Sequence, residues 1–126
     1  MKPLNVILPI FVAAAGCIPS ERVHADTLRW ICKYDAMASP TGVQRENFKL
    51  EFALDTLTKR AVLIGNAGLS DVGFFNGDQA ITFEEKLAGG AVQTTSISHT
   101  DGKSVHSRHS ILNGNFVPSQ YYGACK

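Results

Sequence analysis

The sequence predicts an all-β protein: a small antiparallel flattened barrel or sandwich of about eight short strands, closed by one disulfide. Three observations predict it. Apolar and polar residues alternate in several segments of strand length, which is the period of a strand with one buried face. Glycine, asparagine and aspartate separate these segments at short intervals, as they do in tight hairpin turns. One cysteine lies near each end of the predicted domain, at Cys32 and Cys125.

Residues 1–25 are predicted to be a secretory signal peptide and not part of the fold. Lys2 is the only early charge, an apolar run spans residues 6–15, and the sequence VHA (23–25) precedes the expected cleavage site. The run is shorter than the roughly 20 apolar residues that a membrane span needs. A lipoprotein is the alternative, because AAGC (14–17) resembles the site at which a cysteine, here Cys17, is acylated. We therefore expect a periplasmic or secreted protein.

Both processing routes leave the same two cysteines in the mature domain, residues 26–126. Cys17 is either removed or lipidated, so Cys32 and Cys125 remain to pair in an oxidising compartment. Such a bridge closes almost the whole domain. In the chain-entropy model a loop of about 100 residues contributes about 4.7 kcal/mol to stability. A domain of this size benefits, because its core is modest.

The charge balance excludes two classes of partner. The 126-residue chain has 12 basic and 11 acidic residues; Lys2, Arg22 and Glu21 fall in the leader, so the predicted mature chain has no net charge. No basic run remains to bind nucleic acid or an anionic membrane surface. The expected partner is an envelope protein or a small ligand. We expect no cofactor and no transmembrane segment in the mature chain.

The predicted strands follow one another with little chain between them. The clearest spans residues 48–54, in which Phe48, Leu50, Phe52 and Leu54 share one face. Valine, isoleucine, threonine and phenylalanine, which favour strands, are common in the other segments. These segments are residues 28–34, 60–64, 81–87, 92–98 and 105–112, followed by the tail. The turn sequences between segments are GNAG (65–68), NGD (76–78), GG (89–90), DG (101–102) and NG (113–114).

Two of these turns predict the register of the three strands between residues 81 and 112. If GG (89–90) and DG (101–102) are two-residue hairpin turns, Glu85 pairs with Thr94, and Thr94 pairs with His109. These three side chains then share the inner face, because strand side chains alternate. The other predicted inward residues are Ile81, Phe83, Leu87, Val92, Val105 and Ile111. The predicted outward residues are Thr82, Glu84, Lys86, Gln93, Thr95, His106, Arg108 and Ser110.

The inner row of Glu85, Thr94 and His109 is the candidate catalytic or ligand-orienting unit. A carboxylate and an imidazole joined through a hydroxyl can transfer a proton. The structural alternative is a satisfied polar network or a solvated barrel end. The sequence contains no nucleophile elbow, phosphate loop or metalloprotease motif. Our first functional hypothesis is therefore a non-enzymatic binding module; a small enzyme using Glu85 and His109, and a structural envelope protein, are the alternatives.

Two further features lie on the predicted outer face. Arg108 is a candidate binding residue, and its simpler interpretation is a solvated ion pair with Glu84, worth less than about 1 kcal/mol. His99 lies diagonally across from His106. Two histidines fall short of the three or four ligands that a zinc site uses, so no metal is expected.

The adjacent tyrosines of the tail are candidate binding residues. In a strand, one of Tyr121 and Tyr122 faces inward and the other outward. Packing beside the disulfide explains such a pair structurally. The functional alternative is an aromatic contact for a partner, because tyrosine is enriched in binding surfaces.

The end of the chain resembles a known sequence signature. The stretches SVHSRH (104–109) and VPSQYYGAC (117–125) look like the C-terminal signature of small, uncharacterised exported proteins of alphaproteobacteria. The resemblance implies compartment and fold but no activity. In outline the chain is also similar to the C-type lysozyme inhibitors, small envelope β-barrels with an early cysteine tied near the chain end. Their inhibitory motifs, SGxxY and YxxxTKG, do not occur here.

Overall fold

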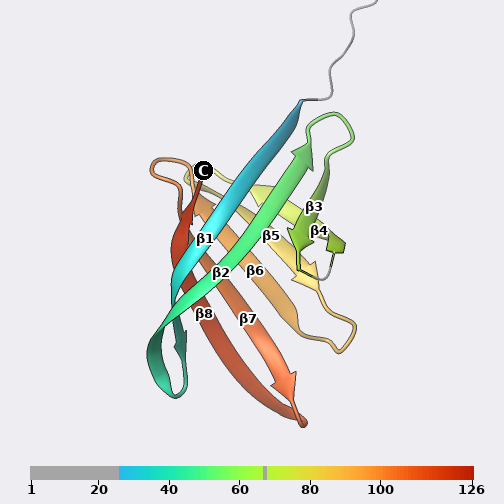
Figure 1. Cartoon of the computed structure of the whole chain (residues 1–126). Coiled ribbons are helices and arrows are strands. Elements are labelled where there is room, and N and C mark those ends of the chain that lie inside the picture. Colours follow the sequence, from blue (N-terminus) through green and yellow to red (C-terminus); the bar gives the residue numbers. More distant parts are fainter. Residues whose placement is uncertain (1–25, 67) are drawn as a thin grey trace, which may run out of the picture.

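The computed structural model describes residues 26–66 and 68–126, which form a closed barrel of eight antiparallel strands. Each strand pairs with the next along the chain, and the last pairs with the first (Figure 1). The predicted all-β class, barrel architecture and strand number are confirmed. The predicted signal peptide, with Cys17, lies outside the described residues.

The strands are long at the two chain ends and short in the middle. They are β1 (Thr27–Ser39), β2 (Gly42–Asp55), β3 (Arg60–Gly65), β4 (Gly68–Asn76), β5 (Ala80–Lys86), β6 (Val92–Ser98), β7 (Lys103–Leu112) and β8 (Asn115–Cys125). Only β4 has no counterpart among the predicted segments. The described part of the chain has no helix with the length and apolarity that crossing a membrane requires.

Alternate side chains of each strand fill the barrel. The row on β2 from Phe48 to Leu54 faces inward as predicted, and the rings of Phe52 and Phe83 stack with centroids 4.4 Å apart. The cavity left in the interior measures only ≈ 10 Å³, which is barely the volume that one water molecule occupies. A ligand must therefore bind at an end of the barrel or on its outside.

The barrel closes where β1 meets β8. Cys32 and Cys125 are directly opposite each other in this ladder and form the predicted disulfide. Backbone hydrogen bonds exchanged between Ile31 and Lys126, each 3.0 Å long, continue the pairing to the end of the chain. The two backbones approach closely at Gly123, where a Cβ would collide with the carbonyl oxygen of Lys33. Only glycine fits there.

The predicted register of β5 against β6 is wrong by one residue. Lys86 pairs with Val92, and the Leu87 N–H donates to the Ala91 carbonyl at 2.9 Å, so the loop comprises residues 88–90 and not 89–90 alone. A slip of one residue moves every side chain of a strand to the other face. The inward residues of β6 are therefore Gln93, Thr95 and Ile97, whereas Thr94 faces outward.

In the next strand, β7, the inward and outward faces are likewise exchanged relative to the prediction. The turn before it spans residues 99–102, and Val105 pairs with Ser96 where Ser98 was predicted. A difference of two residues preserves the relative faces. Contrary to the prediction, His106 and Arg108 face the interior together with Ser104, while Val105, His109 and Ile111 face outward. His106 is 1% exposed, which makes it one of the most buried side chains described.

Two hairpins extend past the rest of the wall at one end. On β2, pairing with β3 begins only at Glu51, and on β7, pairing with β6 ends at Arg108. The β1–β2 and β7–β8 hairpins therefore project together at the lower end of the barrel in Figure 1. We call the end of the barrel beside these hairpins the mouth.

Candidate functional site

The mouth is a shallow cavity of ≈ 330 Å³. Six consecutive strands each contribute an inward side chain to its lining. These are Phe48, Leu63, Ser70, Glu85, Gln93 and Arg108. Side chains alternate between the two faces of a strand, so each of the six strands directs one of these side chains inward at this end of the barrel.

A chain of polar contacts leads from the buried interior to this mouth. Thr95 Oγ1 lies 2.6 Å from His106 Nδ1, and Arg108 Nε donates to His106 Nε2 at 3.1 Å. A guanidinium nitrogen only donates, so His106 Nε2 must be the acceptor. The imidazole is therefore the neutral tautomer with its proton on Nδ1, and that proton is donated to Thr95.

Burial keeps His106 neutral. Loss of water, with the positive charge of Arg108 as the second cause, lowers the pKa of His106 to about 4. Both ring nitrogens already have partners, so the ring has no free position to transfer a proton to a ligand. His106 holds Arg108 in place.

Next to this pair, Tyr34 and Ser104 form a second buried contact, with 2.8 Å between their hydroxyl oxygens. Burial raises the pKa of Tyr34 to about 12, although the hydrogen bond to Ser104 acts in the opposite direction. The phenol stays protonated at physiological pH and closes the interior behind His106.

Arg108 is the residue that this arrangement presents. Its guanidinium carbon lies 4.4 Å from the ring centroid of Phe48 and 4.9 Å from that of Tyr121. The cation therefore rests on two aromatic faces while its Nε is fixed by His106. Among residues 26–66 and 68–126 no carboxylate comes within 4.0 Å of it.

The two Nη groups of Arg108 remain for other contacts. Its hydrogen bond within the described residues is made by Nε, and no fully buried side-chain nitrogen or oxygen there lacks a partner. The Nη groups are thus not sealed in the interior; they reach the mouth, whose lining includes Arg108. A fixed guanidinium with both Nη groups available suits a carboxylate, which accepts two parallel N–H bonds.

The structure separates the predicted row of Glu85, Thr94 and His109. Glu85 faces inward and lines the mouth, as predicted, but Thr94 and His109 lie on the outer face. The proposed proton-transfer pair of Glu85 and His109 is therefore not formed.

Arg108 and Glu84, the expected ion pair, also lie on opposite faces, since Arg108 is inside the barrel and Glu84 is exposed. The two histidines of the outer-face hypothesis are likewise apart. His99 Nε2 lies 2.8 Å from Asn76 Oδ1, whereas His106 contacts Thr95 inside. In the part of the chain that the structure describes, no three His, Cys, Asp or Glu residues cluster as metal ligands.

The tyrosines follow the alternation that the sequence predicted. Tyr121 is buried and its ring packs at a tilt against Phe48 with 4.8 Å between centroids, while Tyr122 is 40% exposed. Tyr121 does not line the mouth itself, but its ring supports the guanidinium of Arg108. Tyr122 lies on the outer face, where its hydroxyl donates to Gln120 at 2.8 Å.

Sequence reasoning missed His106, Thr95 and Gln93 as inward residues. A usable signal was present at the other end of β7. Cys125 must face inward to reach Cys32, so Tyr121, four residues earlier on the same strand, faces inward too. A two-residue turn at Asn113-Gly114 places Tyr121 opposite His106, which is the pairing observed, so His106 shares the inner face.

No protein-family model, curated protein or solved structure matches the chain. The resemblance to small exported proteins and the outline similarity to lysozyme inhibitors therefore stay predictions.

Proposed function

We propose that this protein is a non-enzymatic binding module that holds a small carboxylate-bearing ligand at the mouth of its barrel. The observation that carries the proposal is the state of Arg108: its Nε is bonded to His106, its cation lies over two rings, and its Nη groups are at the mouth. Because these contacts already hold the Arg108 side chain in one conformation, ligand binding costs less conformational entropy.

The size of the mouth supports a small ligand. Its ≈ 330 Å³ is at the lower end of the roughly 300–1,000 Å³ that small-molecule sites occupy. The interior behind it is filled, so a long apolar chain has no room to enter. Both ring nitrogens of His106 already have partners, so His106 cannot act as a base toward a ligand. This favours binding over proton-transfer chemistry.

Glu85 adds a second requirement for the ligand. It lines the same mouth and makes no ion pair within the described residues. β5 and β7 are two strand spacings apart, about 10 Å, with Gln93 between them. A ligand with a carboxylate at Arg108 and an amino group toward Glu85 satisfies both charges, whereas a simple anion satisfies only one.

The proposal is tested by an NMR titration with three probes: acetate, propylammonium and 4-aminobutanoate. We expect 4-aminobutanoate to shift the Arg108 Nε–H and the Gln93 side-chain amide resonances, and to bind at least tenfold more tightly than acetate. Arg108→Met should abolish the shift of the Gln93 side-chain amide, because the side-chain length remains while the charge is lost.

The matched control is Arg29→Met. Arg29 is an outward residue of β1 whose side chain is 64% exposed and pairs with Glu51 at 3.1 Å. Its loss should leave the titration unchanged. If neither acetate nor 4-aminobutanoate perturbs the resonances of Arg108 or Gln93, the mouth is not a carboxylate site.

We propose further that the protein works in an oxidising compartment outside the cytoplasm. The Cys32–Cys125 disulfide supports this, since such bridges persist where thiols are not kept reduced. Mass spectrometry of the exported protein should find Asp26 at the N-terminus. An N-terminal, lipid-modified Cys17 would instead make the protein a lipoprotein.

A further inference from the structure

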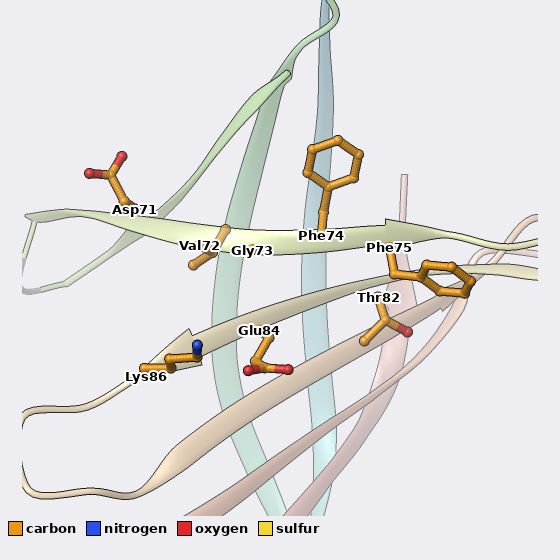
Figure 2. Close-up of a pocket in the computed structure, with 8 residues that line it drawn as sticks. All are labelled: Asp71, Val72, Gly73, Phe74, Phe75, Thr82, Glu84 and Lys86. Atoms are coloured by element: carbon orange, nitrogen blue, oxygen red, sulfur yellow. The ribbon is translucent and has the colours of Figure 1, made fainter. Parts of the chain in front are cut away.

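A second hollow lies on the outside of the barrel, where β4 and β5 separate. The two strands pair over only four positions, from Asn76 opposite Ile81 to Gly73 opposite Glu84. Both strands continue past this point, β4 back to Gly68 and β5 on to Lys86. Figure 2 shows them side by side near Phe75 and Thr82 and diverging toward Asp71 and Lys86.

The direction of the backbone groups in this gap follows from the hairpin turn. The Gly77 N–H donates to the Ala80 carbonyl at 2.9 Å, which makes these two residues a hydrogen-bonded pair. In an antiparallel ladder such pairs recur at every second residue. Leu69 and Asp71 of β4, and Lys86 of β5, therefore direct their N–H and C=O groups into the gap, beyond the last pair of the ladder.

The hollow has the shape and the walls of a binding groove. Its volume is ≈ 450 Å³. Gly73 leaves the floor open between Asp71 and Phe75, and the ring of Phe75 is 72% exposed at one end. Glu84 supplies a carboxylate that has no ion-pair partner within residues 26–66 and 68–126.

We propose that this gap binds a short extended segment of another polypeptide, which adds as a strand to the free edge of β4. Backbone groups of a peptide are the natural partners for the unpaired N–H and C=O groups of Leu69 and Asp71. An apolar side chain of the segment lies over Gly73 against Phe75, and a basic side chain reaches Glu84. The groove lies on the outer side of the gap between β4 and β5, whereas Ser70 and Glu85 line the mouth on the inner side. The peptide proposal does not depend on the function proposed for the mouth.

The test uses a blocked peptide of alternating valine and lysine, together with the same peptide methylated at alternate backbone nitrogens. We expect the first to shift the backbone amide resonances of Leu69, Asp71 and Lys86, and the second to lose at least tenfold in affinity. Methylation removes main-chain donors and keeps every side chain, so equal binding of the two peptides would overturn the proposal.

Two substitutions at one position separate the backbone from the side chain. Asp71→Pro removes the free N–H of β4 without removing a ladder bond to β3, whereas Asp71→Ala keeps the N–H and removes the carboxylate. We expect the proline variant to lose peptide binding and the alanine variant to retain it, with circular dichroism confirming that both fold. If the proline variant does not fold, the methylated peptide still decides. Self-association of the free protein that Asp71→Pro abolishes would assign the edge to a second copy instead and overturn the proposal.

Discussion

Replacing Cys125 with serine is expected to lower the free energy of unfolding by about 4–5 kcal/mol. The bridge joins residues 93 apart in sequence, and in the chain-entropy model a closed loop of that length stabilises the fold by about that much. Total stabilities of domains are about 5–15 kcal/mol, so the variant should be close to unfolding at ordinary temperature. Urea unfolding followed by the fluorescence of Trp30, the one tryptophan of the chain, measures the change.

The second cysteine supplies the control for this experiment. Cys32→Ser, and the double variant, should lose the same free energy as Cys125→Ser, because each removes one and the same bridge. Trp30 packs edge-on against Phe83 with 5.4 Å between centroids, so its emission reports on the core. A loss below about 1 kcal/mol in all three variants would contradict the stabilising role of the bridge.

His106→Ala is expected to destabilise the protein by about 3 kcal/mol. The substitution leaves a cavity, and it removes the partners of Thr95 and of Arg108 Nε, where one unsatisfied buried group alone costs about 1–3 kcal/mol. The matched control is His109→Ala, three residues along the same strand on the exposed outer face, which should change stability by no more than about 0.5 kcal/mol. Equal effects at the two positions would contradict the register of β7.

The same histidine makes stability depend on pH. Because the folded state holds the pKa of His106 at about 4, below its ordinary 6.5, the unfolded chain takes up a proton first as the pH falls. The contribution is full above about pH 6.5, declines between 6.5 and 4, and is lost below 4. It corresponds to about 3 kcal/mol.

A comparison with His106→Gln isolates this contribution, because all other titrating groups are common to both proteins. Relative to the wild type, the glutamine variant should gain about 3 kcal/mol in unfolding free energy between pH 7 and pH 4. Parallel stability curves for the two proteins would mean that the pKa of His106 is the same in the folded and unfolded states, as it is for a ring open to water.

Local sequence patterns were sufficient to predict the architecture, but they did not predict which faces of β6 and β7 are buried. The alternation on β2 and the two-residue turn at Asn113-Gly114, where both residues have positive φ, appear in the structure as predicted. The turn at Gly89-Gly90 is different, because small residues flank it on both sides. Nothing local distinguishes a loop of two residues from one of three there, and that single residue decides which face of β6 and β7 is buried.

The composition of these strands also favoured the wrong face. Val105 and Ile111 look like core residues, yet they are 38% and 41% exposed, while Ser104 and His106 are buried. Burial of the polar residues is possible only because Tyr34 and Thr95 satisfy them from other strands. Such partners are distant in sequence, so the mouth was not predictable from any one segment. For β4, apolar residues on both faces hide the period of a strand.

The closure of β1 on β8 has a consequence for how the chain folds. The other seven strand pairings join neighbours along the chain and form as hairpins from local contacts. Closure alone joins segments at opposite ends of the domain and bears the largest loss of chain entropy. With the cysteines reduced, we expect that step to limit the rate at which the native barrel forms. With the bridge already formed, both ends are held together, and we expect refolding to proceed by pairing of adjacent hairpins.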